Sequence, residues 1–142
     1  MKKKALITVI GRQNYNGDKD EIKMKTVGTI EHCDDRYIIR YDENLEEVST
    51  PLKSKITIAK DESKVEMIKT GPYSSYLVIE KSKRHLCNYG TEYGDMLMGI
   101  FGREVENDFN ENEGTFKFSY DIDINGAISS QNDVIIKFKV CE

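Results

Sequence analysis

Two stretches near the end of the chain alternate hydrophobic and polar residues with a period of two. Their hydrophobic members are Phe116, Phe118, Tyr120, Ile122, Ile124, Val134, Ile136, Phe138 and Val140. Polar residues, such as Lys137 and Lys139, stand between them. Successive side chains of a β-strand point to opposite faces, whereas a helix repeats every 3.6 residues. The pattern therefore predicts two strands that each bury one face.

Shorter segments with the same alternation fill most of the remaining chain, at intervals of roughly 8–12 residues, which is typical of an all-β protein. These segments cover 4–11, 21–30, 37–41, 56–58, 65–67, 75–80, 84–89 and 92–101. Asn, Asp, Gly and Pro, which favour turns, stand between many of them. Together with the two final stretches, they predict roughly ten strands.

Two segments depart from this alternation. Residues 42–51 carry several glutamates and end at Pro51, so they predict a loop or a single helical turn. The acidic segment 104–113 has Val105 and Phe109 four positions apart. That spacing leaves an extended edge strand and a short helix both open.

The pattern predicts an all-β fold made of antiparallel strands. No segment carries a hydrophobic stripe with a helical period long enough for a crossover helix, and parallel pairing needs such crossovers. An up-and-down barrel or a sandwich fits roughly 8–10 strands. We favour the barrel, because closure removes exposed strand edges, and the first and last strands are its natural closing partners. Residues 1–142 are then one domain.

The turn between the last two strands makes a specific prediction. A two-residue turn at Asn125-Gly126 would put Phe118 on the same side as Lys137. A slip of one residue moves a whole strand to the opposite face, so this pairing would bury lysines. We therefore expect either a three-residue loop over 125–127 or a β-bulge before Val134.

Composition narrows the class of protein. The formal net charge of -4 argues against general nucleic-acid binding, which calls for a basic surface. No apolar run approaches the roughly 20 residues of a membrane helix, and the basic start at 2–4 is not followed by a signal-peptide core. Cys33, Cys87 and Cys141 form an odd, widely spaced set, which favours reduced thiols. We expect a cytoplasmic protein that binds neither nucleic acid nor membranes.

Several short motifs resemble those of a known family. They are Lys69-Thr70-Gly71, Tyr89-Gly90-Thr91-Glu92-Tyr93-Gly94, Met96-Leu97-Met98-Gly99-Ile100, Glu113-Gly114 and Phe116-Lys117-Phe118-Ser119-Tyr120-Asp121. The chain resembles the YwiB-like family of uncharacterised bacterial proteins. This resemblance implies a calycin-type, lipocalin-like barrel from the bacterial cytosol and implies no activity. The family pattern has Arg where this chain has Lys69, and a lysine does not reproduce the bidentate fork of an arginine.

The residues that could carry metal or nucleophilic chemistry are few. His32-Cys33-Asp34-Asp35 is a dense cluster of possible ligands, but no second cluster completes a zinc site, so we interpret it as a solvated turn. His85 and Cys87 share a strand face, yet neighbours two apart lie about 6.5–7 Å apart, too far for a direct Cys–His pair. The sequence therefore predicts no metal site, no cofactor and no catalytic residue, and catalysis ranks last among the functions.

Three other features also favour structural interpretations. The glutamates and aspartates of 42–47 and 104–113 lie in polar runs, which is typical of solvated surface. Gly90 and Gly94 are typical of strand bends, although an anion-binding nest stays open. The basic residues of 81–85 indicate a charged hairpin turn.

The segment 92–101 is the most informative for function, because it carries hydrophobic residues on both faces. Methionine adapts to irregular gaps and binding surfaces. Our first hypothesis is a module that binds a small apolar or amphipathic ligand in the barrel. We expect the binding residues to be Tyr89, Tyr93, Met96, Met98 and Tyr120, with Lys69 or Arg40 as a polar anchor. The alternative is a protein-interaction or homodimer module that uses 92–101 and the acidic segment 104–113.

Overall fold

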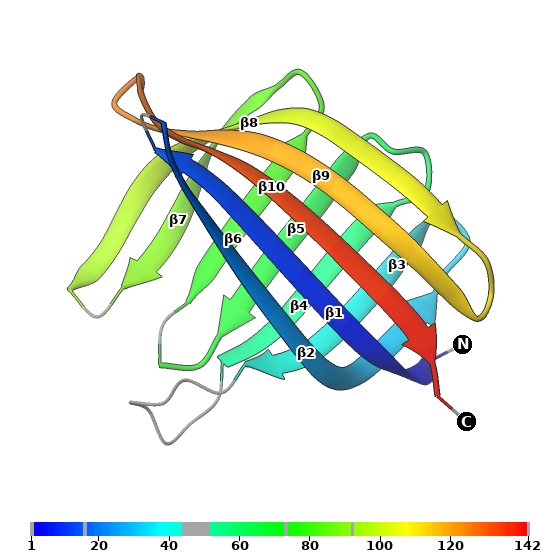
Figure 1. The fold of residues 1–142 in the computed structure, drawn as a ribbon. Coiled ribbons are helices and arrows are strands. Elements are labelled where there is room, and N and C mark those ends of the chain that lie inside the picture. Colours follow the sequence, from blue (N-terminus) through cyan, green and yellow to red (C-terminus); the bar gives the residue numbers. More distant parts are fainter. Residues whose placement is uncertain (1, 16, 44–51, 73, 92, 142) are drawn as a thin grey trace.

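The computed structural model describes residues 2–15, 17–43, 52–72, 74–91 and 93–141. The chain forms ten β-strands and, within these ranges, no helix (Figure 1). The strands are β1 (Lys2–Tyr15), β2 (Asp18–His32), β3 (Arg36–Glu43), β4 (Leu52–Ala59), β5 (Lys64–Thr70), β6 (Ser75–Glu80), β7 (Arg84–Thr91), β8 (Gly94–Phe109), β9 (Glu113–Ile124) and β10 (Ala127–Val140). No helix of the described chain is long and apolar enough to cross a membrane.

The strands close into a single antiparallel barrel. Each strand pairs with its neighbours in sequence, and β1 pairs with β10 to complete the ring. The closing ladder is long, since it runs from Ala5 opposite Val140 to Asn14 opposite Gln131. The up-and-down barrel predicted from the alternation is confirmed, as is the pairing of the first strand with the last.

The hairpin between β9 and β10 resolves the register question. Ile124 pairs with Ala127, so the turn consists of Asn125 (φ 54°) and Gly126 (φ 85°), both left-handed. Such φ values are those of a type I′ hairpin turn. The register then shifts between Ile128 and Ser130, which brings Val134 opposite Phe118. The predicted β-bulge before Val134 is confirmed.

The two segments that broke the alternation have different outcomes. Strand β8 continues through the first part of the acidic segment to Phe109 and pairs with β9, so the strand alternative holds there and the helix alternative is wrong. The segment 42–51 was expected to be a loop or a helical turn. Residues 42–43 still belong to β3, and 44–51 lie outside the described residues.

The barrel has a long-stranded side and a short-stranded side. Strands β1, β2, β8, β9 and β10 have 12–16 residues, whereas β3–β7 have 6–8. In Figure 1 the long strands cross in front of the short ones at a large angle. Among the described residues, β2 pairs with β3 over Thr29 to His32, and Gly28 follows directly beside this ladder. A Cβ at Gly28 would clash with the carbonyl oxygen of Arg40, so only glycine fits this close approach.

One end of the barrel, which we name the closed end, is filled by aromatic rings. The ring centroid of Tyr37 lies 4.3 Å from that of Phe109 and 5.5 Å from that of Phe116. Phe116 in turn stacks on Phe138 at 5.6 Å. Both chain termini lie at this end (Figure 1). We name the opposite end, where the β1–β2 and β9–β10 hairpins turn, the open end.

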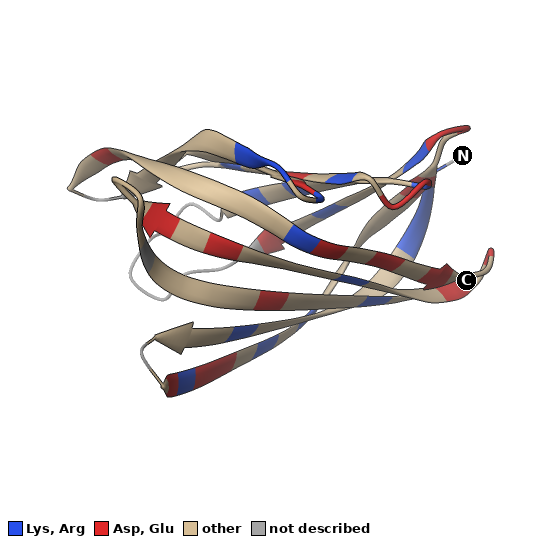
Figure 2. Cartoon of the chain, turned by 90° about the horizontal axis from the view of Figure 1, so that it is seen from above, with Lys and Arg blue, Asp and Glu red and all other residues tan. Residues whose placement is uncertain are grey.

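Charged residues of both signs are spread along the strands of the barrel (Figure 2). Two carboxylates of β9, Asp121 and Asp123, are nearly buried and each pairs with an arginine. Arg84 grips Asp123 with a fork of two hydrogen bonds, 2.7 and 2.8 Å long. The fork holds the pKa of Asp123 below its usual value. These pairs tie β7, β8 and β9 together on the outer surface.

Candidate functional site

A cavity of 820 Å³ opens at the open end of the barrel. We name it the mouth cavity. Its wall is built from the ends of six strands, β1, β2, β3, β5, β9 and β10. Val9, Met24, Met67 and Val134 supply apolar surface, and Tyr41 adds an aromatic ring. The rim carries charged residues of both signs, among them Arg12, Asp20, Lys23 and Asp133.

The space lies beside Gly11, on the inner face of β1. Along β1 the inner face carries Ala5, Ile7, Val9 and then Gly11. A Cβ at Gly11 would meet no atom within 4 Å, so this glycine borders open space. On the far wall, Lys69 pairs in register with two small residues, Ser54 of β4 and Ser75 of β6. The absent side chain of Gly11 is therefore the gap in the wall that the structure shows directly.

Tyr120 is the most deeply placed polar group of the cavity wall, with 7% of its surface exposed. Burial raises the pKa of Tyr120 to about 12, and the neighbouring Tyr89 adds to the rise. Its hydroxyl forms no hydrogen bond with any residue that the structure describes. The phenol therefore stays protonated at neutral pH and presents an unused hydrogen-bonding group to the cavity.

Asn132 lies directly opposite Tyr120 on β10 and is also nine-tenths buried. Its side-chain amide donates a 3.1 Å hydrogen bond to the hydroxyl of Ser130. Gln13 of β1 stands opposite Asn132 on the other side and lines the cavity as well. Three neutral polar side chains thus form one row across β1, β10 and β9.

Most of the residues predicted to bind a ligand gather at the open end. Tyr120 and Lys69 both line the mouth cavity. Tyr89 pairs with Met96, and both share the inner-facing phase of the buried residues Cys87 and Met98. Met98 is packed into the core, whereas Tyr89 and Met96 keep part of their surface exposed. A binding role for each of these residues stays a prediction.

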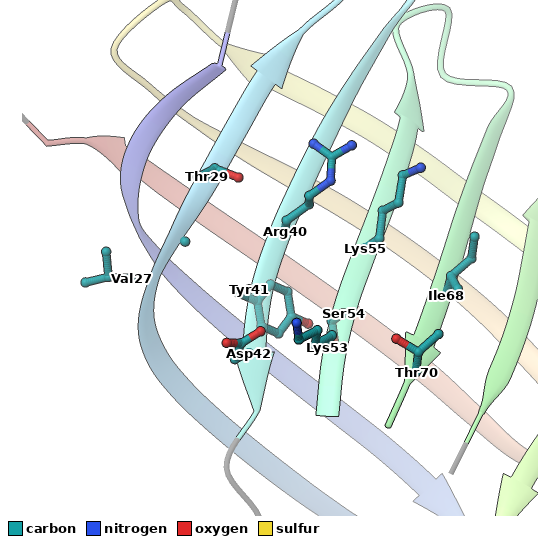
Figure 3. A pocket seen from close by; sticks show the side chains of 11 residues that line it. Val27, Thr29, Arg40, Tyr41, Asp42, Lys53, Ser54, Lys55, Ile68 and Thr70 are labelled. Atoms are coloured by element: carbon teal, nitrogen blue, oxygen red, sulfur yellow. The ribbon is translucent and has the colours of Figure 1, made fainter. Parts of the chain in front are cut away.

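The other two predicted residues lie elsewhere. Tyr93 is at the turn between β7 and β8 and is 93% exposed. Arg40 is on the outer face of β3 and pairs with Glu31 at 2.9 Å. It borders a separate outer pocket of 420 Å³ together with Lys53, Lys55 and others (Figure 3). The structure therefore does not bring Arg40 or Tyr93 to the mouth cavity, and their binding role also stays a prediction.

Sequence reasoning missed several residues of the cavity wall. Met24 on β2 and Met67 on β5 line one cavity only because of how the barrel closes. Asn132 lies within a polar run, Gln131-Asn132-Asp133, that carries no hydrophobic alternation. The bulge before Val134 is the signal that could have shown which of these three faces inward.

The Cys–His pair considered from the sequence has a structural role. Cys87 is buried, and its sulfur accepts a 3.3 Å hydrogen bond from the backbone N–H of Val78. Burial raises the pKa of the Cys87 thiol, which disfavours the reactive thiolate. The His85 ring pairs with Glu80 at 2.8 Å. Among the described residues, no group of three or more His, Cys, Asp or Glu could hold a metal ion.

Comparisons with known proteins agree with this architecture. A search of curated proteins found no match. The barrel is similar to the crystal structure of the ywiB protein from Bacillus subtilis, with a TM-score of 0.86 over 99% of this chain and 94% of that one. The identity is 13%, so this likeness shows the fold alone. A family model described as "Domain of unknown function (DUF1934)" matches residues 7–136, which confirms the YwiB-like resemblance: the chain belongs to this family.

Proposed function

We propose that this protein binds a small, partly apolar molecule in the mouth cavity, without chemical conversion. The observation that carries the proposal is a cavity of 820 Å³ into which Tyr120, nine-tenths buried, presents a hydroxyl that no described residue engages. Ligand pockets typically measure about 300–1,000 Å³ and combine an apolar wall with a few placed polar groups. The mouth cavity has both features.

Support also comes from the position of the Tyr120 hydroxyl, which borders the cavity. It is not among the buried side-chain atoms that lack a partner, so it is open to the cavity and not sealed in the wall. A ligand in the cavity would complete its hydrogen bond. The methionines Met24 and Met67 suit this role, since their flexible side chains adapt to the shape of an occupant.

Two finer points belong to the same proposal. We infer a calycin-type, lipocalin-like barrel, because the resemblance to the YwiB-like family implies it and such barrels hold ligands at an open mouth. We also infer a cytoplasmic location. All three cysteines are free, and Cys33 and Cys141 are partly exposed, which suits a reducing compartment.

The test is a titration with Nile red, a neutral dye whose fluorescence rises in apolar surroundings. The substitution Gly11→Leu places a large side chain in the cavity, at a position where a Cβ would meet no atom within 4 Å. Thr8→Leu adds the same side chain on the outer face of the same strand and serves as the matched control. We expect the dye to bind the parent protein and Thr8→Leu with equal affinity, and Gly11→Leu at least tenfold more weakly.

Equal dye binding by Gly11→Leu and Thr8→Leu would contradict the proposal, since the dye would then lie outside the cavity. Native mass spectrometry of protein purified from a bacterial lysate provides a second readout. A co-purifying mass that is present in the parent protein and lost in Gly11→Leu would support the proposal.

A second candidate function is a homodimer module, favoured by the outer face of β6–β8. Leu86 and Leu97 are each 67% exposed on adjacent strands, and Tyr76 and Phe101 extend the same outer surface. We propose a second copy of the chain as the occupant, because a two-fold copy would cover these four apolar side chains with the same four side chains. Sedimentation velocity should then report a dimer for the parent protein and a monomer for Leu97→Glu. A monomeric parent at high concentration would rule this candidate out.

A further inference from the structure

The polar row in the mouth cavity carries no formal charge. Gln13, Asn132 and Tyr120 pair in register across β1, β10 and β9, and all three line the cavity. The next strand presents Gly102 opposite Tyr120, which adds no side chain. Within this part of the wall, the only hydrogen bond from the three side chains to a described residue joins Asn132 to Ser130.

Each side chain of the row can both donate and accept a hydrogen bond. A phenol donates and accepts, and an amide does both through two different atoms. Because one end of the Asn132 amide is engaged by Ser130, the other end remains for an occupant of the cavity. The phenol of Tyr120 stays protonated far above neutral pH, since burial holds its pKa high. A donor and an acceptor therefore stand side by side on neighbouring strands.

The remaining surface of the cavity is largely apolar. Met24 on β2 and Met67 on β5 line it without offering strong hydrogen bonds. A carboxylate or phosphate placed against the polar row would lose its water, and Arg12, the cation next to Gln13 on β1, is already paired with Glu21 at 2.9 Å. Burying a charge without a partner is far more costly than burying an uncharged polar group that is hydrogen-bonded.

We propose that the Gln13–Asn132–Tyr120 row recognises an uncharged hydrogen-bonding group, such as a carboxamide or a hydroxyl, on a ligand whose apolar part lies against Met24 and Met67. This inference rests on the proposed function, and it adds the chemical class of the ligand head. The competing possibility is an anionic head held by Lys69, which enters the cavity from β5.

The experiment compares two probes that share one alkyl chain, octanamide and octanoate, by isothermal titration calorimetry at pH 7. We expect octanamide to bind at least about tenfold more tightly than octanoate, in line with the cost of desolvating a carboxylate. Tighter binding of octanoate would overturn the inference, while binding of either probe inside the cavity would leave the proposed function standing. Binding of neither probe, together with a failed dye titration, would overturn both.

Two variants locate the contact. Tyr120→Phe removes a hydroxyl that no described residue engages, so the fold is retained and octanamide affinity should fall about fivefold. Tyr76→Phe is the matched control, because its hydroxyl bonds Glu66 at 3.1 Å on the outer surface, and it should leave affinity unchanged. Lys69→Met removes the competing anchor for an anionic head from the cavity wall, so it should lower octanamide affinity less than Tyr120→Phe does. Loss of binding in Lys69→Met with none in Tyr120→Phe would overturn the inference.

Discussion

The two ends of this barrel use the same strands for opposite purposes. At the closed end, Tyr37, Phe109, Phe116 and Phe138 stack on one another and fill the interior. At the open end the same long strands present Gly11, Asn132 and Tyr120 to an open space of 820 Å³. The closed end is therefore filled by its own side chains, whereas the open end leaves space beside Gly11. The contrast separates a packed half from a hollow half, and the proposed binding function belongs to the hollow one.

The two faces of β9 near the open end differ in how they hold polar atoms. The carboxylates of Asp121 and Asp123 lie nearly buried in the outer wall, and each has an arginine partner. In the mouth cavity, the hydroxyl of Tyr120 has no such partner among the described residues. Proteins pair the great majority of their buried polar groups. The Oγ of Ser54, the Oδ1 of Asn107 and the Oδ1 of Asp121 are buried without a partner among the described residues, so what distinguishes the Tyr120 hydroxyl is the cavity that it borders.

The largest expected effect tests this division directly. Phe116 is fully buried in the aromatic cluster, so Phe116→Ala should lower the free energy of unfolding by about 3–5 kcal/mol. Met67 borders an existing cavity and loses fewer contacts, so Met67→Ala should lower it by about 1 kcal/mol. Urea denaturation followed by circular dichroism measures both. Similar losses in the two variants would show that the ends are equally packed.

The next effect concerns alkaline pH. The folded protein raises the pKa of Tyr120 to about 12, while an unfolded tyrosine titrates near 10. Between these values the folded state retains a proton that the unfolded state has lost, so stability falls as pH rises. The full loss is on the order of 2–3 kcal/mol and is complete above the folded pKa.

Comparing the parent protein with Tyr120→Phe isolates this contribution. The stability of the variant should decline less steeply than that of the parent between about pH 10 and pH 12, as measured by denaturant titration at each pH. Parallel curves would mean that Tyr120 is solvated in the open cavity. Ligand occupancy would then be unnecessary to explain its hydroxyl.

Much of the fold could be predicted from the sequence, because alternation is a local signal. The alternating hydrophobic residues of 116–124 and 134–140 were enough to predict strands, an inward face and the bulge that keeps both faces in phase. The same signal also places Arg40 on the outer face, since Tyr37, Ile39 and Tyr41 share the inner one. Choosing Arg40 as an anchor inside the barrel went against that pattern.

The site was harder to predict, because it depends on registers between strands far apart in the chain. The row of Gln13, Asn132 and Tyr120 forms only when β1 closes against β10, with the bulge between Ile128 and Ser130 already counted. The space beside Gly11 is equally non-local, since an absent side chain matters only once the opposite wall is known. Single-strand patterns carry no information on either.

Two glycines, one at each end of the barrel, allow the same comparison to be made with a single added methyl group. A Cβ at Gly114, on the inner face of the closed end, would lie 2.5 Å from the Cβ of Phe109 and 2.7 Å from the ring of Phe138. Gly114→Ala should therefore destabilise the protein by about 1–3 kcal/mol through overpacking. Gly11→Ala adds the same methyl group to open space and should be neutral or stabilising by up to about 1 kcal/mol.

Thermal and urea denaturation of both glycine variants check this prediction. Neither glycine has a left-handed φ, so backbone strain does not complicate the interpretation. Destabilisation by Gly11→Ala that equals the loss in Gly114→Ala would mean that the mouth cavity closes in solution.

The smallest effect needs no substitution. Strand β9 is paired on both sides along most of its length, so its backbone hydrogen bonds are comparable from end to end. Its two halves differ in what they pack against, with Phe116 in the aromatic cluster and Ile122 toward the open end. Local opening is easier where fewer apolar contacts are broken. Amide hydrogen exchange near Ile122 should therefore be about tenfold faster than near Phe116, equivalent to about 1.4 kcal/mol in opening free energy.

Adding a ligand that fills the mouth cavity should slow exchange near Ile122 and leave Phe116 unchanged, because a bound occupant restores the missing contacts at one end only. Uniform exchange along β9, with or without ligand, would show that the barrel opens as a single unit and that its two ends are not energetically distinct.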